Sequence, residues 1–350
     1  MTATHRLERT VADVVAIASI AAPTFAEEAR IAWLEERLAD APGTRRRDEA
    51  GNLVWTIGEQ PDVLVAAHVD TVFDAATPLE IVRRDTTMHG PGVGDNAAAV
   101  AVVVSVVEEL AAEGDTSVAV AFTVGEEGLG NLRGARLAVS ELGPRLVIAV
   151  EGHGLDRVVV DGVGSVRIRI SVAGPGGHPW VNRGTPSALH ALLDIGARLV
   201  AEGRSDPVVN VGTVAGGRSV NSIAESAELL VEARSLDPDA LAAFEREVDA
   251  LAVPKPLELS VAVLGRRPAG SLDRESELLQ TVLEVREELG LGGILDAGST
   301  DANVALGAGI PALTLGVTTG GGMHTTAEWI DWPSLAIGAA QIERTLRRLT

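Results

Sequence analysis

The sequence of 350 residues contains no cysteine. Disulfides, thiolate nucleophiles and zinc or iron–sulfur sites with cysteine ligands are therefore all excluded. Any metal ion in this protein must be bound by His, Asp or Glu side chains. Tyrosine is absent as well, and aromatic residues make up only 3% of the chain, a bias that we attribute to genomic composition.

Basic residues are also scarce. The chain has 29 Lys and Arg against 49 Asp and Glu, which gives a formal net charge of -20. A charge of this sign and size repels phosphate backbones and anionic membrane surfaces. We therefore expect neither a nucleic acid nor a membrane as a partner.

Long apolar runs are missing too. The longest candidate, Ala97–Val107, is about half as long as a membrane-spanning helix. The N-terminal residues lack the apolar segment of a secretory signal peptide. A cytoplasmic location is the resulting expectation.

The residues that are present indicate a globular α/β protein, since 46% are hydrophobic and 22% are charged. Apolar runs at Val63–Val69, Val118–Val124 and Leu146–Val150 are typical of strands buried on both faces of a parallel sheet. The apolar segment Ala97–Ala112 predicts a buried helix. Because strands and helices alternate, we predict an α/β domain with a mostly parallel sheet and helices on both faces.

The pattern changes after Gly162, where apolar and polar residues alternate along Val166–Val172 and predict a strand with one wet face. The following elements are predicted in the order β-α-β-β-α-β, which fits a ferredoxin-like α+β unit. The α/β pattern then resumes. The sequence therefore predicts one domain made of residues 1–163 and 266–350, with a second domain, residues 164–265, inserted in it.

Acidic and imidazole side chains follow the predicted buried strands directly. His68 and Asp70 end the first strand, Glu126 and Glu127 follow the second, and Glu151 follows the third. Ligands bind at the carboxyl ends of strands in open α/β sheets, so these side chains are candidates for a metal site. Residues two apart in an extended segment point the same way, so Asp70 can orient His68.

Adjacent carboxylates such as Glu126 and Glu127 can take two roles, one as a metal ligand and one as a general base. Each feature also has a plainer interpretation. Two adjacent glutamates are more often a solvated charged turn, and a lone His-x-Asp is more often an ordinary surface pair. The position of all of them at strand ends favours the metal site.

Two glycine-rich segments add another acidic residue and another histidine. Asp95 follows the run Gly90–Gly94, and His324 lies within Gly320–Thr326. A phosphate-binding loop is excluded at Asp95, because neither the GxGxxG spacing nor the Walker lysine is present, and the only lysine of the chain is Lys255. Glycine allows a sharp turn from which Asp95 can reach between two cations. Asp95 can also cap the following helix, and both roles can hold at once.

Five motifs of the chain together resemble, in the same order, those of the M20 family of metallopeptidases and amidohydrolases. This family includes glutamate carboxypeptidase, succinyl-diaminopimelate desuccinylase, acetylornithine and acetyl-lysine deacetylases and peptidase T. The resemblance covers nearly the whole chain. The motifs are Ala67–Val72, Gly92–Asn96, Thr123–Gly128, Val150–Glu151 and Met323–Thr325.

The resemblance implies a co-catalytic site with two zinc ions, for which cobalt or manganese could substitute. His68 and Glu151 would bind one ion. Glu127 and His324 would bind the other, and Asp95 would bridge both.

The resemblance also implies roles for residues that are not ligands. Glu126 would be the general base and Asp70 would orient His68. The peptide bond between Asp95 and Asn96 would be cis.

Three residues of the inserted domain resemble substrate-contacting residues of the family. His178 corresponds to the lid histidine that polarises the scissile carbonyl, often from the partner subunit of a dimer, and Asn221 to a second substrate contact. Arg234 falls where relatives hold an arginine that pairs with a substrate carboxylate. The resemblance thus implies a lid domain through which a homodimer can form. Whether His178 acts within its own chain or across the dimer stays open.

The expected function is that of a metal-dependent hydrolase that cleaves an amide bond in a small molecule through a zinc-activated water. In the family, glutamate at the position of Glu151 accompanies carboxypeptidases and N-deacylases. Together with Arg234, this favours a small peptide or an N-acyl amino acid that carries a free carboxylate. One alternative is an aminopeptidase for di- or tripeptides, similar to peptidase T. A second is a catalytically silent binding or scaffolding relative.

Overall fold

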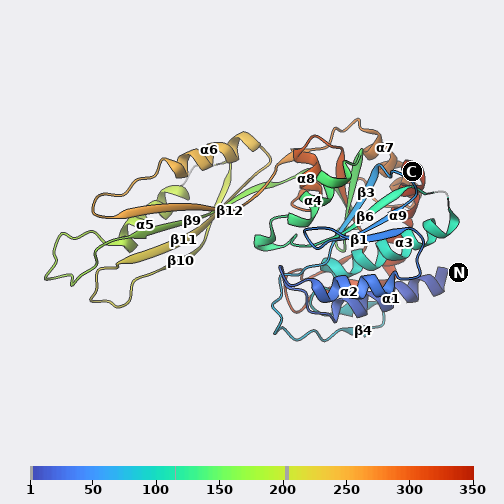
Figure 1. Ribbon diagram of the computed structural model, residues 1–350, viewed down its shortest axis with the longest axis horizontal. Coiled ribbons are helices and arrows are strands. Elements are labelled where there is room, and N and C mark those ends of the chain that lie inside the picture. Colours follow the sequence, from blue (N-terminus) through green and yellow to red (C-terminus); the bar gives the residue numbers. More distant parts are fainter. Residues whose placement is uncertain (1–2, 115, 202–204) are drawn as a thin grey trace. The chain divides into compact units, whose positions relative to one another are not determined.

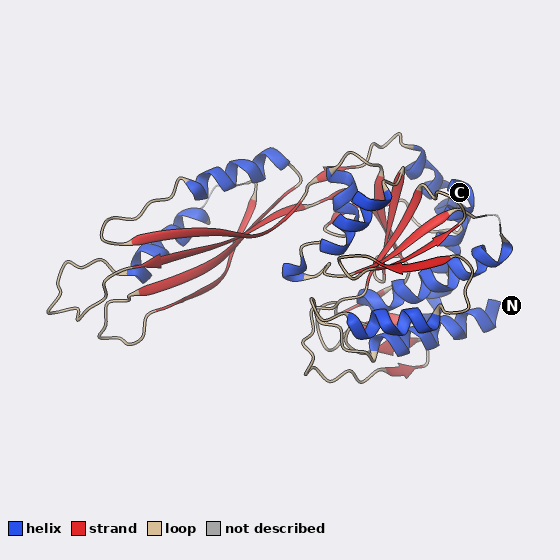
Figure 2. Ribbon diagram, viewed as in Figure 1, coloured by secondary structure: helices blue, strands red, loops and turns tan. Residues whose placement is uncertain are grey.

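The computed structural model describes residues 3–114, 116–201 and 205–350 (Figures 1 and 2). The chain divides into two compact units. One combines Met1–Gly162 with Ser271–Thr350, and the other is Val163–Gly270.

A nine-stranded mixed sheet forms the centre of the first unit, within the described residues. The neighbours β6, β3, β7 and β15 run parallel to one another. Next to this parallel core, β2 pairs antiparallel with β6, and β8 pairs antiparallel with β15. The predicted α/β class is confirmed. In spatial order the strands are β1 (Thr44–Arg47), β2 (Leu53–Ile57), β6 (Val118–Thr123), β3 (Val63–His68), β7 (Leu146–Glu151), β15 (Ala312–Gly316), β8 (Arg157–Gly162) and β13 (Gly270–Ser271), with β14 (Ile294–Gly298) paired to β8.

Helices lie on both faces of this sheet, as predicted (Figure 2). The apolar helix α3 is buried along Ala99–Val104, and β3 and β6 are buried at every residue. In the described part of the chain, no helix is long and apolar enough to cross a bilayer. The helices are α1 (Ala3–Ala18), α2 (Glu28–Arg37), α3 (Ala99–Glu113), α4 (Arg133–Leu142), α7 (Glu277–Glu288), α8 (Ala302–Gly307) and α9 (Leu335–Leu349), with short helical turns at Val93–Ala98, Gly128–Gly130 and Trp332–Ser334.

A small second sheet joins two distant parts of the first unit. Its strands, in the order β16 (Gly320–Gly321), β17 (Trp329–Asp331), β5 (Thr87–His89) and β4 (Val82–Arg84), pair antiparallel throughout. The glycine-rich segment around His324 therefore lies beside the chain that leads into Gly90–Asp95.

The second unit has the element order β9 (Gly164–Ala173), α5 (Ala188–Leu199), β10 (Val208–Gly216), β11 (Ser226–Ser235), α6 (Pro238–Asp249) and β12 (Glu258–Arg267). Its four strands are antiparallel in the spatial order β10-β11-β9-β12. This is the ferredoxin-like arrangement expected from the β-α-β-β-α-β pattern. Pairing between β9 and β12 continues to Arg267, two residues beyond the predicted end of this domain at residue 265. The compact unit itself ends at Gly270.

Alternation along β9 gives this sheet two different faces. Val166, Ile168, Ile170 and Val172 are buried in a core that also contains residues of α5 and α6. The opposite face is polar, and ion pairs cross it from β9 to β11, from Arg167 to Glu232 and from Arg169 to Glu228.

Candidate metal centre

Three neighbouring parallel strands end at one edge of the large sheet, and each brings a predicted ligand there. His68 is the last residue of β3 and Glu151 the last residue of β7. Glu126 and Glu127 follow the end of β6, which pairs with β3. The side chains of His68, Glu126 and Glu127 are buried, so the plainer interpretation of a solvated turn does not apply.

Asp95 lies in a buried turn at the start of the helical segment before α3. Its peptide bond to Asn96 is cis, as predicted. The Asn96 side chain donates to the carbonyl oxygen of Val150 at 3.1 Å and accepts from the backbone N–H of Gly152 at 2.9 Å. These bonds hold the turn against the end of β7.

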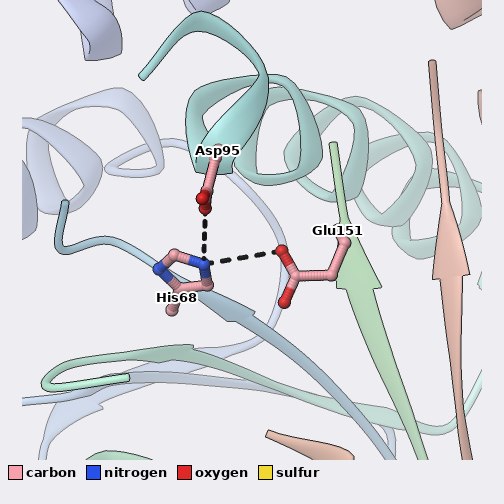
Figure 3. A group of neighbouring side chains, drawn as sticks. All are labelled: His68, Asp95 and Glu151. Carbon is pink, nitrogen blue, oxygen red and sulfur yellow. Dashed lines mark ion pairs between the residues drawn. The ribbon is translucent and has the colours of Figure 1, made fainter. Parts of the chain in front are cut away.

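The carboxylate of Asp95 lies between two histidines (Figure 3 shows the first of them). Its Oδ1 is 3.1 Å from His68 Nε2, and its Oδ2 is 3.0 Å from His324 Nε2. His68 Nε2 is also 3.5 Å from Glu151 Oε2, and His324 Nε2 is 3.3 Å from Glu127 Oε1. The five predicted ligands therefore form two groups of three that share Asp95.

Among the described residues, three overlapping groups have ligand atoms within 4.8 Å of one another, which is close enough for a metal ion. Two are the groups that share Asp95. The third contains His68, Glu127 and Glu126, so the predicted base lies beside the predicted ligands.

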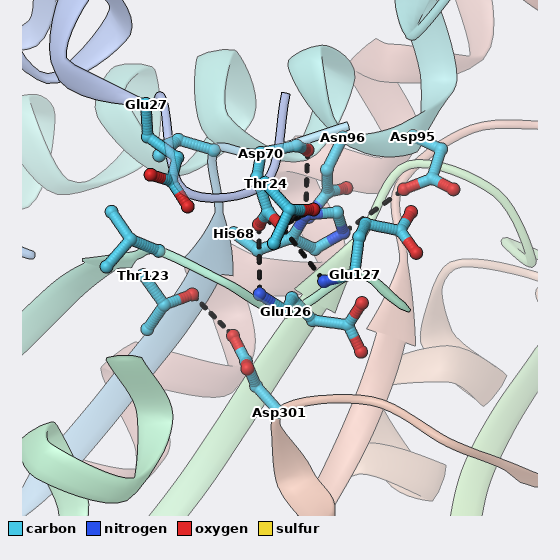
Figure 4. A network of polar contacts seen from close by, with 12 residues as sticks. Thr24, Glu27, His68, Asp70, Asp95, Asn96, Thr123, Glu126, Glu127 and Asp301 are labelled. Atoms are coloured by element: carbon cyan, nitrogen blue, oxygen red, sulfur yellow. Dashed lines mark hydrogen bonds and ion pairs between the residues drawn. The ribbon is translucent and has the colours of Figure 1, made fainter. Parts of the chain in front are cut away.

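The Asp70 carboxylate organises this edge of the sheet (Figure 4). It accepts the backbone N–H groups of Glu126 at 3.0 Å and Glu127 at 2.9 Å, and the hydroxyl of Thr24 at 2.9 Å. His68 Nδ1 faces the same residue, 3.2 Å from the backbone oxygen of Asp70 and 3.5 Å from its carboxylate. An Nδ1–H donated to Asp70 leaves Nε2 as the ligand atom.

The acidic surroundings shift the pKa values of both histidines upward. Hydrogen bonds to Asp95 and Glu127 raise the pKa of His324 to about 10. Burial opposes the charged form of His68, but the carboxylate of Glu151 and those of its other neighbours raise its pKa well above the usual value. Both shifts have the same cause, which is the negative charge of the carboxylates that face the imidazole nitrogens.

Burial and the two imidazoles also shift the pKa values of the neighbouring carboxylates, and burial shifts that of Arg30. Burial opposes ionisation of Asp95, yet hydrogen bonds from His324 and His68 lower its pKa. Burial raises the pKa of Glu151 to about 6. The Arg30 guanidinium is fully buried and donates to backbone oxygens of Ile20 at 2.9 Å and Val69 at 2.8 Å. Burial lowers its pKa to about 10, so it remains a cation near the acidic cluster at neutral pH.

The donor set fits a divalent metal. Two imidazole nitrogens with carboxylate oxygens suit zinc, and cobalt or manganese can replace it.

The model of peptidase family M20/M25/M40 matches residues 64–348. The chain belongs to this family. This is the family predicted from the five motifs.

Similar proteins agree with this assignment. A probable carboxypeptidase of Aspergillus flavus is 28% identical over 229 residues, covering 57% of this chain and 54% of that protein. The chain thus spans about half the length of this relative. The crystal structure of a tripeptidase from Staphylococcus aureus has a TM-score of 0.80 at 23% identity and covers 98% of both chains. A dinuclear metal-binding peptidase of the M20 family from Bacillus subtilis has a TM-score of 0.69 at 18% identity, covering 99% of both chains. At these identities the two structures show the shared fold.

The three remaining predicted site residues of this member of the M20 family lie in the second unit. His178 is exposed in the loop after β9, and its Nδ1 accepts the backbone N–H groups of Trp180 at 3.2 Å and Val181 at 3.4 Å. Asn221 is exposed and its Oδ1 accepts from Ser219 Oγ at 2.8 Å.

Arg234 lies on the polar face of β11. It donates to both carboxylate oxygens of Glu232, at 2.8 and 3.1 Å, and its side chain is 43% exposed. Arg234 is predicted to bind a substrate carboxylate. In this structure it is already paired with a carboxylate of its own strand, Glu232.

Several polar residues around the centre, buried or partly buried, were not predicted from the sequence. Glu328 and His153 form a close pair beside the Asp95 turn. Asp301 accepts the hydroxyl of Thr123 at the end of β6 (Figure 4). One local signal was available for Glu328, since it follows His324 by four residues, just after the glycine-rich segment.

We expect Asp70→Ala to lower the free energy of unfolding of the metal-free protein by about 3–5 kcal/mol, because it removes the carboxylate that accepts two buried N–H groups and faces the buried imidazole of His68 at 3.5 Å. Asp74→Ala is the control, since Asp74 is exposed and accepts from Ala76 N within its own turn. Its cost should be at most about 1 kcal/mol. Denaturant unfolding measures both variants, and equal losses would contradict this role of Asp70.

Metal binding should release protons, and the apparent affinity should rise with pH toward about 10. His324 and His68 bind protons more tightly in the folded metal-free protein than in the unfolded chain. Their contribution to the stability of the metal-free fold is complete below a pH of about 6.5 and is lost as the pH rises through the folded values. A metal must displace these protons.

Calorimetry of zinc binding in buffers of different ionisation enthalpy counts the released protons at pH 7. His324→Ala should release about one proton fewer than the wild type. An affinity that is independent of pH between 6 and about 9 would contradict the prediction.

Proposed function

We propose that this protein is a two-metal amidohydrolase that cleaves an amide bond in a small peptide or an N-acyl amino acid with a free carboxylate. One observation carries the proposal. The two oxygens of the Asp95 carboxylate lie 3.1 and 3.0 Å from the Nε2 atoms of His68 and His324. Each oxygen of this carboxylate faces a different imidazole, which is the arrangement required of a ligand that bridges two ions.

The proposed ligands are His68 and Glu151 for one zinc ion, Glu127 and His324 for the other, and Asp95 for both. The distances of 3.5 Å from His68 to Glu151 and 3.3 Å from His324 to Glu127 support this division. When bound, ions of this kind polarise an amide carbonyl and lower the pKa of water.

Glu126 is the proposed general base. Its backbone is held by Asp70, and its side chain is buried within reach of His68 and Glu127. A carboxylate in this position accepts a proton from the attacking water and passes it to the leaving amine.

His178 is the proposed donor to the carbonyl oxygen of the scissile amide. Because Nδ1 accepts the N–H groups of Trp180 and Val181, the neutral ring carries its proton on Nε2. An Nε2–H can stabilise the negative charge that develops on that oxygen. The loop supplies this tautomer whether the histidine serves its own chain or a partner in a homodimer.

The free carboxylate of the substrate is assigned to Arg234. A second carboxylate can take the place of Glu232, because the guanidinium is partly exposed and Glu232 retains its pair with Arg167. The carboxypeptidase names of curated relatives support this choice. Asn221 is the proposed second substrate contact.

An aminopeptidase acting on tripeptides is the second candidate. It is favoured by the likeness in fold to the S. aureus tripeptidase and to the aminopeptidase PepT of Bacillus cereus, the latter with a TM-score of 0.74 at 22% identity.

Glu126→Ala should keep both metal ions and lose about 10²- to 10⁴-fold in kcat, because it removes only the proton acceptor. The matched control is its neighbour, Glu127→Ala, which should lose metal as well as activity. Metal content by atomic emission and steady-state kinetics separate the two. Near-wild-type turnover by Glu126→Ala would refute the assignment of the base.

A panel of N-acyl amino acids and free-amine di- and tripeptides, hydrolysed by the zinc-loaded protein with a chelator control, tests the substrate. We expect chelator-sensitive release from the acylated set. Preference for free-amine peptides would establish the aminopeptidase instead, and no hydrolysis with full metal content would indicate a silent relative.

Arg234→Ala should raise KM for carboxylate-bearing substrates by about 10- to 100-fold, since a hydrogen bond to a charged group contributes about 1.5–3 kcal/mol. Arg169→Ala is the matched control, because Arg169 also lies on the polar sheet face and pairs with a glutamate, Glu228. Equal KM values for the two variants would contradict the assignment of Arg234 as the residue that binds the substrate carboxylate.

A further inference from the structure

Glu328 is a fully buried carboxylate that accepts hydrogen bonds from the backbone of the Asp95 turn. Its Oε2 accepts the N–H of Gly92 at 2.6 Å. Its Oε1 accepts the N–H groups of Gly94 at 3.1 Å and of Asp95 itself at 2.8 Å. Both oxygens of one side chain therefore hold the turn that carries the proposed bridging ligand.

The main chain of Glu328 contacts the same turn. Its carbonyl oxygen accepts the N–H of Gly90 at 2.9 Å. Glu328 directly precedes β17, which pairs with β5. The position of Glu328 is thus determined on one side by the small sheet.

His153 completes the surroundings of this carboxylate. Its Nε2 lies 2.7 Å from Glu328 Oε1. His153 follows Glu151 by two residues, and Glu328 follows His324 by four. One carboxylate therefore connects the three segments that carry Asp95, Glu151 and His324.

Gly94 packs closely against this pair. A Cβ atom at Gly94 would clash with His153 Nε2 and would lie 2.7 Å from Glu328 Oε1. Any larger residue at this position would therefore displace the turn, the carboxylate or the imidazole.

We propose that Glu328 is a positioning residue of the metal centre, which holds the Gly92–Asp95 turn so that the Asp95 carboxylate lies between His68 and His324. The inference rests on the proposed two-metal function and deepens it. Glu328 is not a ligand in this proposal, because its oxygens are occupied by the N–H groups of the turn and by His153. It acts through the backbone of Asp95.

A carboxylate suits this task better than an amide. In Glu328→Gln, the amide oxygen can accept from the turn on one side, but the amide NH₂ on the other side then faces an N–H donor. The side chain keeps its volume while the turn loses part of its support. The variant therefore tests the hydrogen bonds rather than the packing.

The affinity of the metal-free protein for cobalt should fall by about 10- to 100-fold in Glu328→Gln, the usual effect of losing a group that orients a ligand. The visible spectrum of the cobalt-loaded variant should differ from that of the wild type, because the geometry at Asp95 changes. With substrate, kcat should fall while KM stays within about twofold, since Glu328 does not contact substrate.

Asp13→Asn is the matched control. Asp13 is also a buried carboxylate of the first unit, and it accepts three hydrogen bonds from two nitrogens of Arg37, at 2.9 to 3.1 Å. This variant should lose thermal stability but keep the cobalt affinity and spectrum of the wild type. A general loss of stability alone therefore cannot imitate the effect expected at Glu328.

Cobalt is titrated into each full-length protein against a competing chromophoric chelator. If the wild type does not bind two ions, the proposed function fails. If the wild type binds two ions and Glu328→Gln does so with the same affinity and spectrum, the positioning role alone is overturned. Should Glu328→Gln not fold, His153→Ala, which withdraws one partner of the same carboxylate, takes its place, and wild-type affinity and spectrum in that variant would overturn the proposal.

Discussion

The burial of the Asp95 carboxylate between two imidazoles is the constraint on which the surrounding structure depends. Transfer of a charged carboxylate from water into a protein interior is costly unless an opposite charge or several hydrogen bonds accompany it. The surrounding carboxylates raise the pKa values of His68 and His324 and so favour their positively charged forms, and the buried Arg30 guanidinium adds a cation near the cluster. A divalent ion can replace the imidazole protons without rearrangement, because the same nitrogen and oxygen atoms already face one another.

Two further carboxylates of the centre accept hydrogen bonds from the backbone of the segments that carry the candidate ligands. Asp70 accepts the consecutive N–H groups of Glu126 and Glu127, and Glu328 accepts those of Gly94 and Asp95. Strand ends alone leave the following residues free to adopt several conformations. Hydrogen bonds from buried carboxylates to successive N–H groups restrict these segments, and a reactive site requires its groups to be held within fractions of an ångström.

The second unit carries the proposed substrate-contacting residues on a polar sheet face and in loops. Its helices cover only one side of the sheet, which leaves Arg167, Glu232 and Arg234 in a network on the other side. Under the proposed function, exchange of Glu232 for a substrate carboxylate would replace one ion pair by a similar one and would select substrates that carry a carboxylate. The His178 loop likewise selects one ring tautomer through two backbone N–H groups.

Most of the elements, and the strand ends that carry the candidate ligands, could be recognised in the sequence. Apolar periodicity depends on neighbours a few residues apart, so the parallel strands, the change of pattern after Gly162 and the residues that end β3, β6 and β7 could all be recognised locally. Which other polar residues are buried at that edge of the sheet follows only from the folded structure. Glu328 and Arg30 resemble ordinary exposed charges in the sequence, and the bond from Asp95 N–H to Glu328 joins residues 233 positions apart. A contact of this kind produces no periodic pattern in the sequence. It depends on where folded segments meet and not on the order of residues within either segment.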